Sequence, residues 1–311
     1  MKTDGHNTNS SYRRGGNNNR PTGQPGPDRN GPPANPGSDL GNLSLTAWDL
    51  ARTRKKQPDT ARGHVMTLRS HQRLVASFES ERKIPQHERS FLRIKETARG
   101  SVLFIHGVSS SPGNLRELAD RMFDVDFNTY VLRLPDHGTK GDTISGVPWK
   151  SSLTQVWQDY RLLARGGGKV HVVGMGFGAA LALHLAAKER VSSLVLLGPA
   201  LMPRNSFFQR MMVRLKLHRL PLVHSWLGWN ADLIEGMNQA RGKVSKIKVP
   251  IYAAHCEDDD RACPTSLRFL QRKARHSASR FRVFPDGGHA ILETHGQSAL
   301  FKDILKFCKG G

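Results

Sequence analysis

A short apolar run that breaks into glycines and then resumes with helical spacing extends from Val170 to Ala187. Its centre, starting at Val172, reads Val-Val-Gly-Met-Gly-Phe-Gly-Ala. We interpret this stretch as a buried strand, a sharp turn and a helix. Glycine permits the strained backbone of such a turn, and its lack of a side chain lets the strand and the helix pass closely. The stretch therefore requires a sheet with a helix packed on it, as in mixed α/β architectures.

Strands and helices alternate on both sides of this turn. That order predicts an α/β fold with a mostly parallel central sheet and helices on both faces. The expected strands are 91–94, 101–105, 130–132, one beginning at Val170, 193–197, 249–253 and 281–284, and the expected helices are 114–123, 152–163, 177–189, 264–274 and 298–308.

Three segments of different composition divide the chain. Residues 1–40 contain almost no large apolar side chain and are expected to be a disordered polar tail. Residues 41–85 mix leucines with many arginines and lysines, which indicates a basic amphipathic helical arm. Residues 86–311 form the α/β domain, interrupted at about 203–248 by an apolar and basic insertion that predicts a small helical cap. The arm has two interpretations: it binds a membrane surface or a partner, or it packs on the domain with its basic face in solvent.

The chain is strongly basic, with 47 Lys and Arg against 26 Asp and Glu, a net charge of +21. Such a charge attracts anionic surfaces, including membranes, without specificity. No zinc-finger, homeodomain or RNA-binding signature accompanies it, so we expect no specific nucleic-acid partner. The N-terminus has no apolar signal segment, no window is apolar enough to span a membrane, and only three cysteines occur. A cytoplasmic location, with peripheral membrane attachment left open, is the expectation.

Neither a metal nor an organic cofactor is expected. His255 and Cys256 with Cys263 lack the second ligand pair of a zinc site. Gly174-x-Gly176-x-x-Ala179 also matches a dinucleotide-binding fingerprint. No acidic residue follows the next strand, however, and the motif lies deep in the chain, so the context argues against a dinucleotide.

Four markers follow strands of the predicted sheet in a fixed order. They are His106-Gly107 after an early strand, the glycine turn at Gly176, Asp260 after a late strand and His289 after the last one. From about residue 90 onward, the chain resembles the carboxylesterase and monoacylglycerol lipase branch of the α/β-hydrolase superfamily. Further support comes from Pro135-Asp136-His137-Gly138, which is similar to that branch's Pro-Gly-His-Gly loop, and from Gly287-Gly288-His289.

The resemblance implies a role for each marker. His289 would be the general base and Asp260 the carboxylate that orients it, because Asp260 begins an Asp-x-x-x-Pro turn; Asp258 and Asp259 are adjacent alternatives. The backbone N–H groups of Val108 and Phe177 would form the oxyanion hole. The implied reaction is hydrolysis of a carboxylic ester or monoacylglycerol through an acyl-enzyme.

Gly176 occupies the position of the nucleophilic serine, and glycine has no side chain to attack a carbonyl. Three explanations compete. The chain is a natural pseudoenzyme that binds an acyl or apolar ligand, a membrane or a protein partner; the serine has been replaced; or another hydroxyl substitutes, with Ser109, Ser110 and Ser111 as the candidates. For these serines, a purely structural role in a turn is the alternative. The sequence leaves the substrate chain length and the oligomeric state open.

Overall fold

The computed structural model describes residues 60–135, 137, 147–202, 207–217, 220 and 229–310. The expected polar tail, the first part of the basic arm, Asp136 and Gly138, and parts of the cap segment lie outside these residues. Within the described part of the chain, no helix combines the length and the apolar character needed to cross a bilayer.

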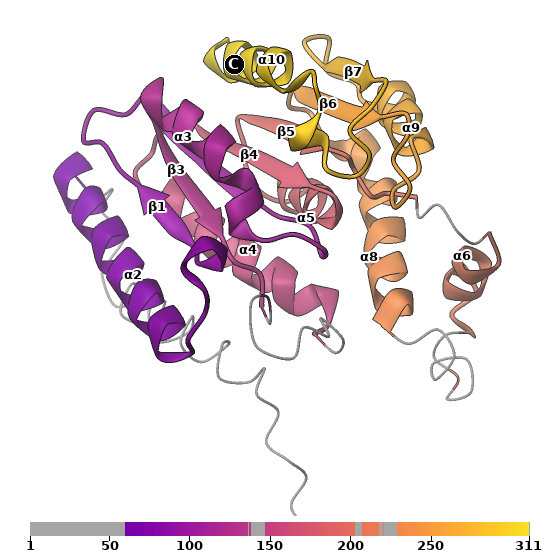
Figure 1. Cartoon of the computed structure of the whole chain (residues 1–311), viewed down its shortest axis with the longest axis horizontal. Coiled ribbons are helices and arrows are strands. Elements are labelled where there is room, and N and C mark those ends of the chain that lie inside the picture. The colour runs from indigo at the N-terminus through magenta and orange to yellow at the C-terminus, as the bar shows by residue number, and fades with distance from the viewer. Residues whose placement is uncertain are drawn as a thin grey trace, which may run out of the picture. The chain divides into compact units, whose positions relative to one another are not determined.

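Seven strands form one sheet in the order β1-β3-β2-β4-β5-β6-β7 (Figure 1). Only the edge strand β1 runs antiparallel to its neighbour β3, and all other pairs are parallel. The mostly parallel sheet predicted from the alternation of elements is therefore confirmed. The strands are β1 (Phe91–Arg93), β2 (Gly100–Ile105), β3 (Phe127–Leu132), β4 (Val170–Met175), β5 (Ser193–Leu197), β6 (Ile251–Cys256) and β7 (Arg280–Phe284).

Helices cover both faces of the sheet, as predicted. Successive side chains of a strand point to opposite faces, and in β2 Leu103 and Ile105 enter one hydrophobic core while Val102 and Phe104 enter the other. The first core includes side chains of α2 (Ala61–Glu81), α4 (Trp149–Ala164), α5 (Phe177–Ala186), α8 (Trp229–Lys243) and α9 (Thr265–Lys273), and the second those of α3 (Arg116–Asp124) and α10 (Gln297–Lys309).

The expected cap segment contains α6 (Phe207–Arg214) and α8. α8 also packs against α5 and contributes Met237 and Ala240 to the core. Asp232 of α8 accepts a hydrogen bond from the backbone N–H of Trp149 at the start of α4 (2.6 Å). The second half of this segment is therefore part of the domain body. The described residues also form short 3-10 helices at Gln86–Glu88, Pro112–Leu115, Val244–Lys246 and Ile291–Glu293.

Helix α2, in the second half of the expected basic arm, packs on the domain. Leu68 is fully buried in the first core, and Gln72 donates a hydrogen bond to the carbonyl of Leu92 in β1 (2.9 Å). His71 lies 3.1 Å from the hydroxyl of Tyr130 in β3. Residues 61–81 therefore pack on the domain and leave Arg62, Arg69 and Arg73 exposed.

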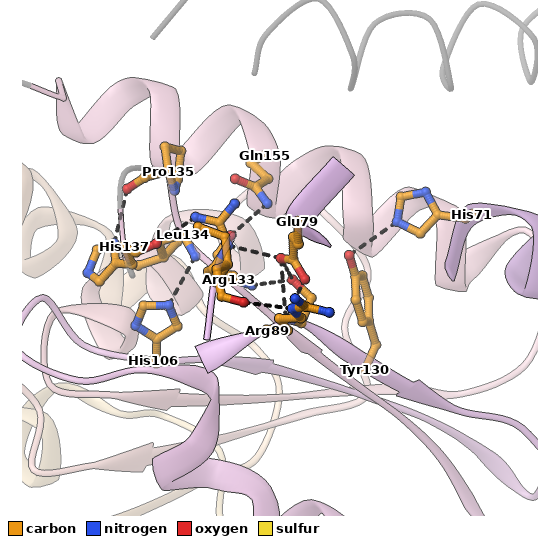
Figure 2. Close-up of polar contacts among 12 residues, drawn as sticks. His71, Glu79, Arg89, His106, Tyr130, Arg133, Leu134, Pro135, His137 and Gln155 are labelled. Atoms are coloured by element: carbon orange, nitrogen blue, oxygen red, sulfur yellow. Dashed lines mark hydrogen bonds and ion pairs between the residues drawn. The ribbon is translucent and has the colours of Figure 1, made fainter. Parts of the chain in front are cut away.

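A buried ion pair joins α2 to the loop after β3. Glu79 is 1% exposed and Arg133 is 4% exposed, with 2.9 Å between the Arg133 Nε and the Glu79 Oε1 (Figure 2). Glu79 also accepts hydrogen bonds from the backbone N–H and the hydroxyl of Ser90 (3.0 and 2.7 Å). Because both charges have left water, each depends on the other for compensation.

We expect the Glu79→Ala substitution to lower the free energy of unfolding by about 3–5 kcal/mol, because it leaves the buried Arg133 guanidinium without a counterion. The matched control is Glu189→Ala, which removes the more exposed ion pair with Arg161 (2.8 Å) and should cost about 1 kcal/mol or less. Urea denaturation of both variants measures the difference. An equal decrease in the free energy of unfolding of both variants would show that the buried ion pair contributes no more to stability than the exposed one.

Candidate functional site

The site is built around the turn at Gly176, between the end of β4 and the start of α5. Gly176 has φ 57° and ψ −121°, a conformation that costs other residues about 1–3 kcal/mol. Its N–H donates to the carbonyl of Leu197 (2.9 Å), and its own carbonyl accepts from the N–H of Ala200 (3.0 Å). Hydrogen bonds to the end of β5 and to the residues after it therefore hold the turn on both sides.

The neighbouring Gly178 is required by close packing. A Cβ at this position would overlap the carbonyl oxygens of Ile105 and His106, so α5 approaches the end of β2 as closely as backbones allow. The tight strand-to-helix passage inferred from the glycines is thus found in the structure. This approach brings the segment after β2 beside the turn, where the Cα of Gly107 lies 3.6 Å from a Cβ built on Gly176.

The ring of His289 faces the turn. A Cβ built on Gly176 would lie 3.4 Å from Nε2 and 3.6 Å from Cε1 of His289, which are ordinary van der Waals distances. The side chain of His289 is about one-quarter exposed. The ring of the predicted base therefore lies next to the predicted nucleophile position, and a small side chain at position 176 would contact it.

The opposite ring nitrogen of His289 is held by Asp259. Nδ1 lies 3.1 Å from Oδ2 and 3.2 Å from Oδ1 of this fully buried carboxylate. Asp259 also accepts backbone hydrogen bonds from Arg261 (2.9 Å) and Ala262 (2.8 Å), and its Oδ2 lies 3.1 Å from Nε2 of the buried His255. A carboxylate in this position fixes both the ring orientation and the tautomer of its histidine.

The pKa of Asp259 reflects this environment. Burial by itself raises the pKa of a carboxyl group, but the hydrogen bonds from His255, His289 and the N–H groups of Ala262 and Arg261 outweigh it. The pKa is consequently held well below its usual range, so Asp259 is ionised at neutral pH.

Asp260, the carboxylate expected to orient His289, does not contact it; this assignment is corrected to Asp259. Asp260 is exposed and lines the mouth of the cavity described below. Asp258, the other alternative, accepts a hydrogen bond from the N–H of Gly288 (2.8 Å). The Asp-x-x-x-Pro pattern favours Asp260, but in the structure the loop after β6 buries Asp259 and exposes Asp260. His255 was not identified as a contributor, although its i, i+4 spacing from Asp259 was visible.

The loop after β2 contains the candidate substitute nucleophiles. The hydroxyl of Ser110 accepts from the N–H of Gly107 (2.7 Å) and lies 3.1 Å from its carbonyl, and the N–H of Ser111 bonds the side chain of Asn114 (2.9 Å). These contacts give Ser110 and Ser111 the role of turn residues. Ser109 is exposed, and both Ser109 and Ser110 line the cavity described below.

The two predicted oxyanion donors lie on the segments that meet at the turn. Phe177 is the first residue of α5, so its N–H has no acceptor within the helix. Val108 follows Gly107, and its carbonyl lies 3.0 Å from Nε2 of His137. Their action on a bound oxygen stays a prediction.

A cavity of about 340 Å³ opens in front of the turn. Gly176 and His289 form part of its wall. The remaining lining includes the apolar side chains of Met175 and Leu292 and the charged side chains of Asp260, Arg261 and Glu293. Among the described residues, no three His, Cys, Asp or Glu side chains group as a metal site would require.

Comparison with known proteins identifies the family of the fold. Residues 102–301 match the model of the alpha/beta hydrolase family. No curated protein sequence matches the chain closely enough to count as a relative.

Several solved structures share the fold at low sequence identity. A structure described under the metagenome-derived lipolytic enzymes LipS and LipT has a TM-score of 0.64 at 14% identity, over 73% of this chain and 100% of that one. Monoacylglycerol lipase from Paleococcus ferrophilus has a TM-score of 0.60 at 16% identity, over 70% and 96%. Monoglyceride lipase from Saccharomyces cerevisiae has a TM-score of 0.55 at 14% identity, over 70% and 90%. Because the family model matches more than half of the chain, the chain belongs to the alpha/beta hydrolase family.

Proposed function

We propose that this protein has an esterase/lipase-type site that binds carboxylic esters or the acids derived from them, and that Gly176 prevents the acyl-enzyme step. The observation that carries the proposal is the 3.4 Å between Nε2 of His289 and a Cβ built on Gly176, with Asp259 bonded to the far side of the ring. The base and its carboxylate are assembled for a hydroxyl that this chain lacks.

The chemistry follows from the geometry. A serine hydroxyl at position 176 would transfer its proton to Nε2 of His289 as its oxygen attacks the ester carbonyl, and Asp259 would stabilise the imidazolium. The N–H groups of Val108 and Phe177 would stabilise the tetrahedral oxyanion. The imidazolium would then protonate the leaving alkoxide, and water would release the acid from the acyl-enzyme. Without the serine, only about 10³–10⁴ of rate enhancement over water is expected from the remaining groups.

The cavity supports a ligand of limited size. Its volume of about 340 Å³ is near the lower end of the range of about 300–1,000 Å³ that small-molecule sites occupy. Met175 and Leu292 supply apolar surface, and Arg261 supplies a cation at the same opening. A short or medium acyl chain with a polar head fits this lining. Two neighbours are monoacylglycerol or monoglyceride lipases, and a third, Est1E from Butyrivibrio proteoclasticus, is described with bound ferulic acid.

The Gly176→Ser variant should gain esterase activity and covalent labelling by a fluorophosphonate. Gly176→Ala is the matched control, because it adds the same Cβ and the same backbone strain without the oxygen. We expect only the serine variant to be labelled, and to hydrolyse p-nitrophenyl esters at least about 10²-fold faster than the alanine variant.

Two results would contradict this proposal. Labelling of the native chain, located at Ser109 or Ser110 by mass spectrometry, would identify a substitute nucleophile. Hydrolysis by the unlabelled native chain at the rate of the serine variant would mean that water attacks directly and that Gly176 does not silence the site.

In the Gly176→Ser background, the Asp259→Asn substitution should lower kcat by about 10⁴-fold, because it removes the group that sets the His289 tautomer. Asp260→Asn should leave kcat nearly unchanged, since its carboxylate does not touch His289. Steady-state kinetics on one ester compares the two. The reverse order of effects would restore Asp260 as the orienting carboxylate.

A second function, attachment to an anionic membrane surface, is favoured by the outer face of α2. Met66 and Leu74 are 63% and 49% exposed there and are flanked by Arg62, Arg69 and Arg73. Large apolar side chains among cations are typical of helices that lie on a membrane surface.

Co-sedimentation with phosphatidylserine vesicles tests this attachment. The Met66→Ser/Leu74→Ser variant should bind several-fold more weakly than the native chain, because it loses apolar contact while keeping its charge. A matched Val283→Ser variant changes an exposed apolar residue on β7 and should bind normally. If all three proteins bind equally, or none binds, α2 is not a membrane anchor.

A further inference from the structure

Two histidines hold successive carbonyl groups of the loop after β2. His106 lies with Nδ1 2.8 Å from the carbonyl of Gly107, and its Nε2 accepts the N–H of Leu134 (3.0 Å). His137 lies with Nε2 3.0 Å from the carbonyl of Val108. The two rings pack edge to face, with 4.5 Å between their centroids. The Gly107 carbonyl shares its planar peptide unit with the N–H of Val108, and the Val108 carbonyl belongs to the next unit. The two histidines therefore restrict rotation of the backbone on both sides of Val108.

Arg133 fixes the loop that carries His137. Its guanidinium donates from one terminal nitrogen to the carbonyl of His137 (2.7 Å) and from Nε to Glu79 (2.9 Å). The backbone of Arg133 is also tied, since its N–H donates to Ser90 Oγ (3.0 Å) and its carbonyl accepts from Gln155 (2.9 Å). Figure 2 shows Arg133 between Glu79 and the loop, with the rings of His106 and His137 beyond it.

Burial makes this chain of contacts stiff. Glu79, Arg133, His106 and His137 are all buried, so water cannot readily replace a lost partner. A charge-assisted hydrogen bond in such surroundings is stronger and more directional than one in solvent. Movement of Glu79 would therefore be transmitted to Arg133 and to the carbonyl of His137.

We propose that His137 is a positioning residue for the predicted oxyanion donor at Val108, and that α2 secures it through Glu79 and Arg133. This inference rests on the proposed function, because it assigns the loop a role in stabilising an oxyanion. It also assigns α2 a role in positioning the loop after β2. This helix lies outside residues 102–301, which match the family model.

The position of the proton on the His137 ring determines which of two carbonyl groups receives its hydrogen bond. Its Nδ1 faces the carbonyl of Pro135 at 3.0 Å, so both ring nitrogens lie next to acceptors. Burial lowers the pKa of His137, although the backbone contacts oppose this. A neutral ring donates from one nitrogen only, and the tautomer protonated at Nε2 donates to Val108.

Two near-isosteric substitutions separate the contacts. In His137→Gln the terminal amide reaches the position of Nε2 and can still donate to Val108, whereas in His137→Asn it reaches only the position of Nδ1. In the Gly176→Ser background, we expect His137→Asn to lower kcat by about 10- to 100-fold with KM nearly unchanged. Complete loss of an oxyanion donor costs about 10²–10³, and a tilted donor should cost part of that. His137→Gln should retain most of the activity.

Amide hydrogen exchange on the chain with Gly176 tests the same contacts without catalysis. The N–H groups of Gly107 and Ser110 are bonded within the loop and report its order. They should exchange faster in His137→Asn and in Glu79→Gln than in the native chain and His137→Gln. Glu189→Gln, which weakens the ion pair between Glu189 and Arg161 of α4, serves as the control and should not change these exchange rates.

The outcomes distinguish the two proposals. If Gly176→Ser is inactive but the exchange pattern holds, the proposed function fails and the contact chain stands. If the asparagine and glutamine variants behave alike in both kinetics and exchange, His137 does not position Val108. Unchanged exchange in Glu79→Gln would remove α2 from the site.

Discussion

The backbone turn at Gly176 determines where every other group of the site lies. A positive φ at the end of β4 turns the chain abruptly into α5, and the turn is held by hydrogen bonds to Leu197 and Ala200. Because α5 then passes within backbone contact of β2, the loop that starts at Gly107 is drawn to the same point. His289 reaches it from the loop after β7. Three separate segments therefore converge on a residue with no side chain.

The groups around Gly176 are closely tied together although this position carries no side chain. Asp259 is fully buried, is bonded to two histidines and two backbone N–H groups, and has its pKa depressed. Keeping a carboxylate ionised in the interior costs free energy unless every partner is in place. We propose that this arrangement binds a ligand and that the absence of a hydroxyl at position 176 limits its chemistry.

The sequence predicted those features that depend on local pattern. Strand and helix alternation gave the mostly parallel sheet, and the spacing of Gly176 and His289 after strands placed them correctly at one edge. It could not decide among three adjacent aspartates, because burial of Asp259 and exposure of Asp260 depend on how the loop leaves β6. The ion pair between Glu79 and Arg133 could not be predicted either. The two residues are 54 positions apart, and local sequence patterns carry no information on such contacts.

The structure of Gly176→Ser with a phosphonate ester bound to the serine would test the account most directly. We predict that Oγ is covalently attached, that His289 Nε2 stays within hydrogen-bond distance of it while Nδ1 contacts Asp259, and that the phosphoryl oxygen receives the N–H groups of Val108 and Phe177 at about 2.7–3.1 Å. A phosphoryl oxygen directed away from both N–H groups, or a His289 ring turned out of the site, would contradict the claim that this protein retains an assembled hydrolase site.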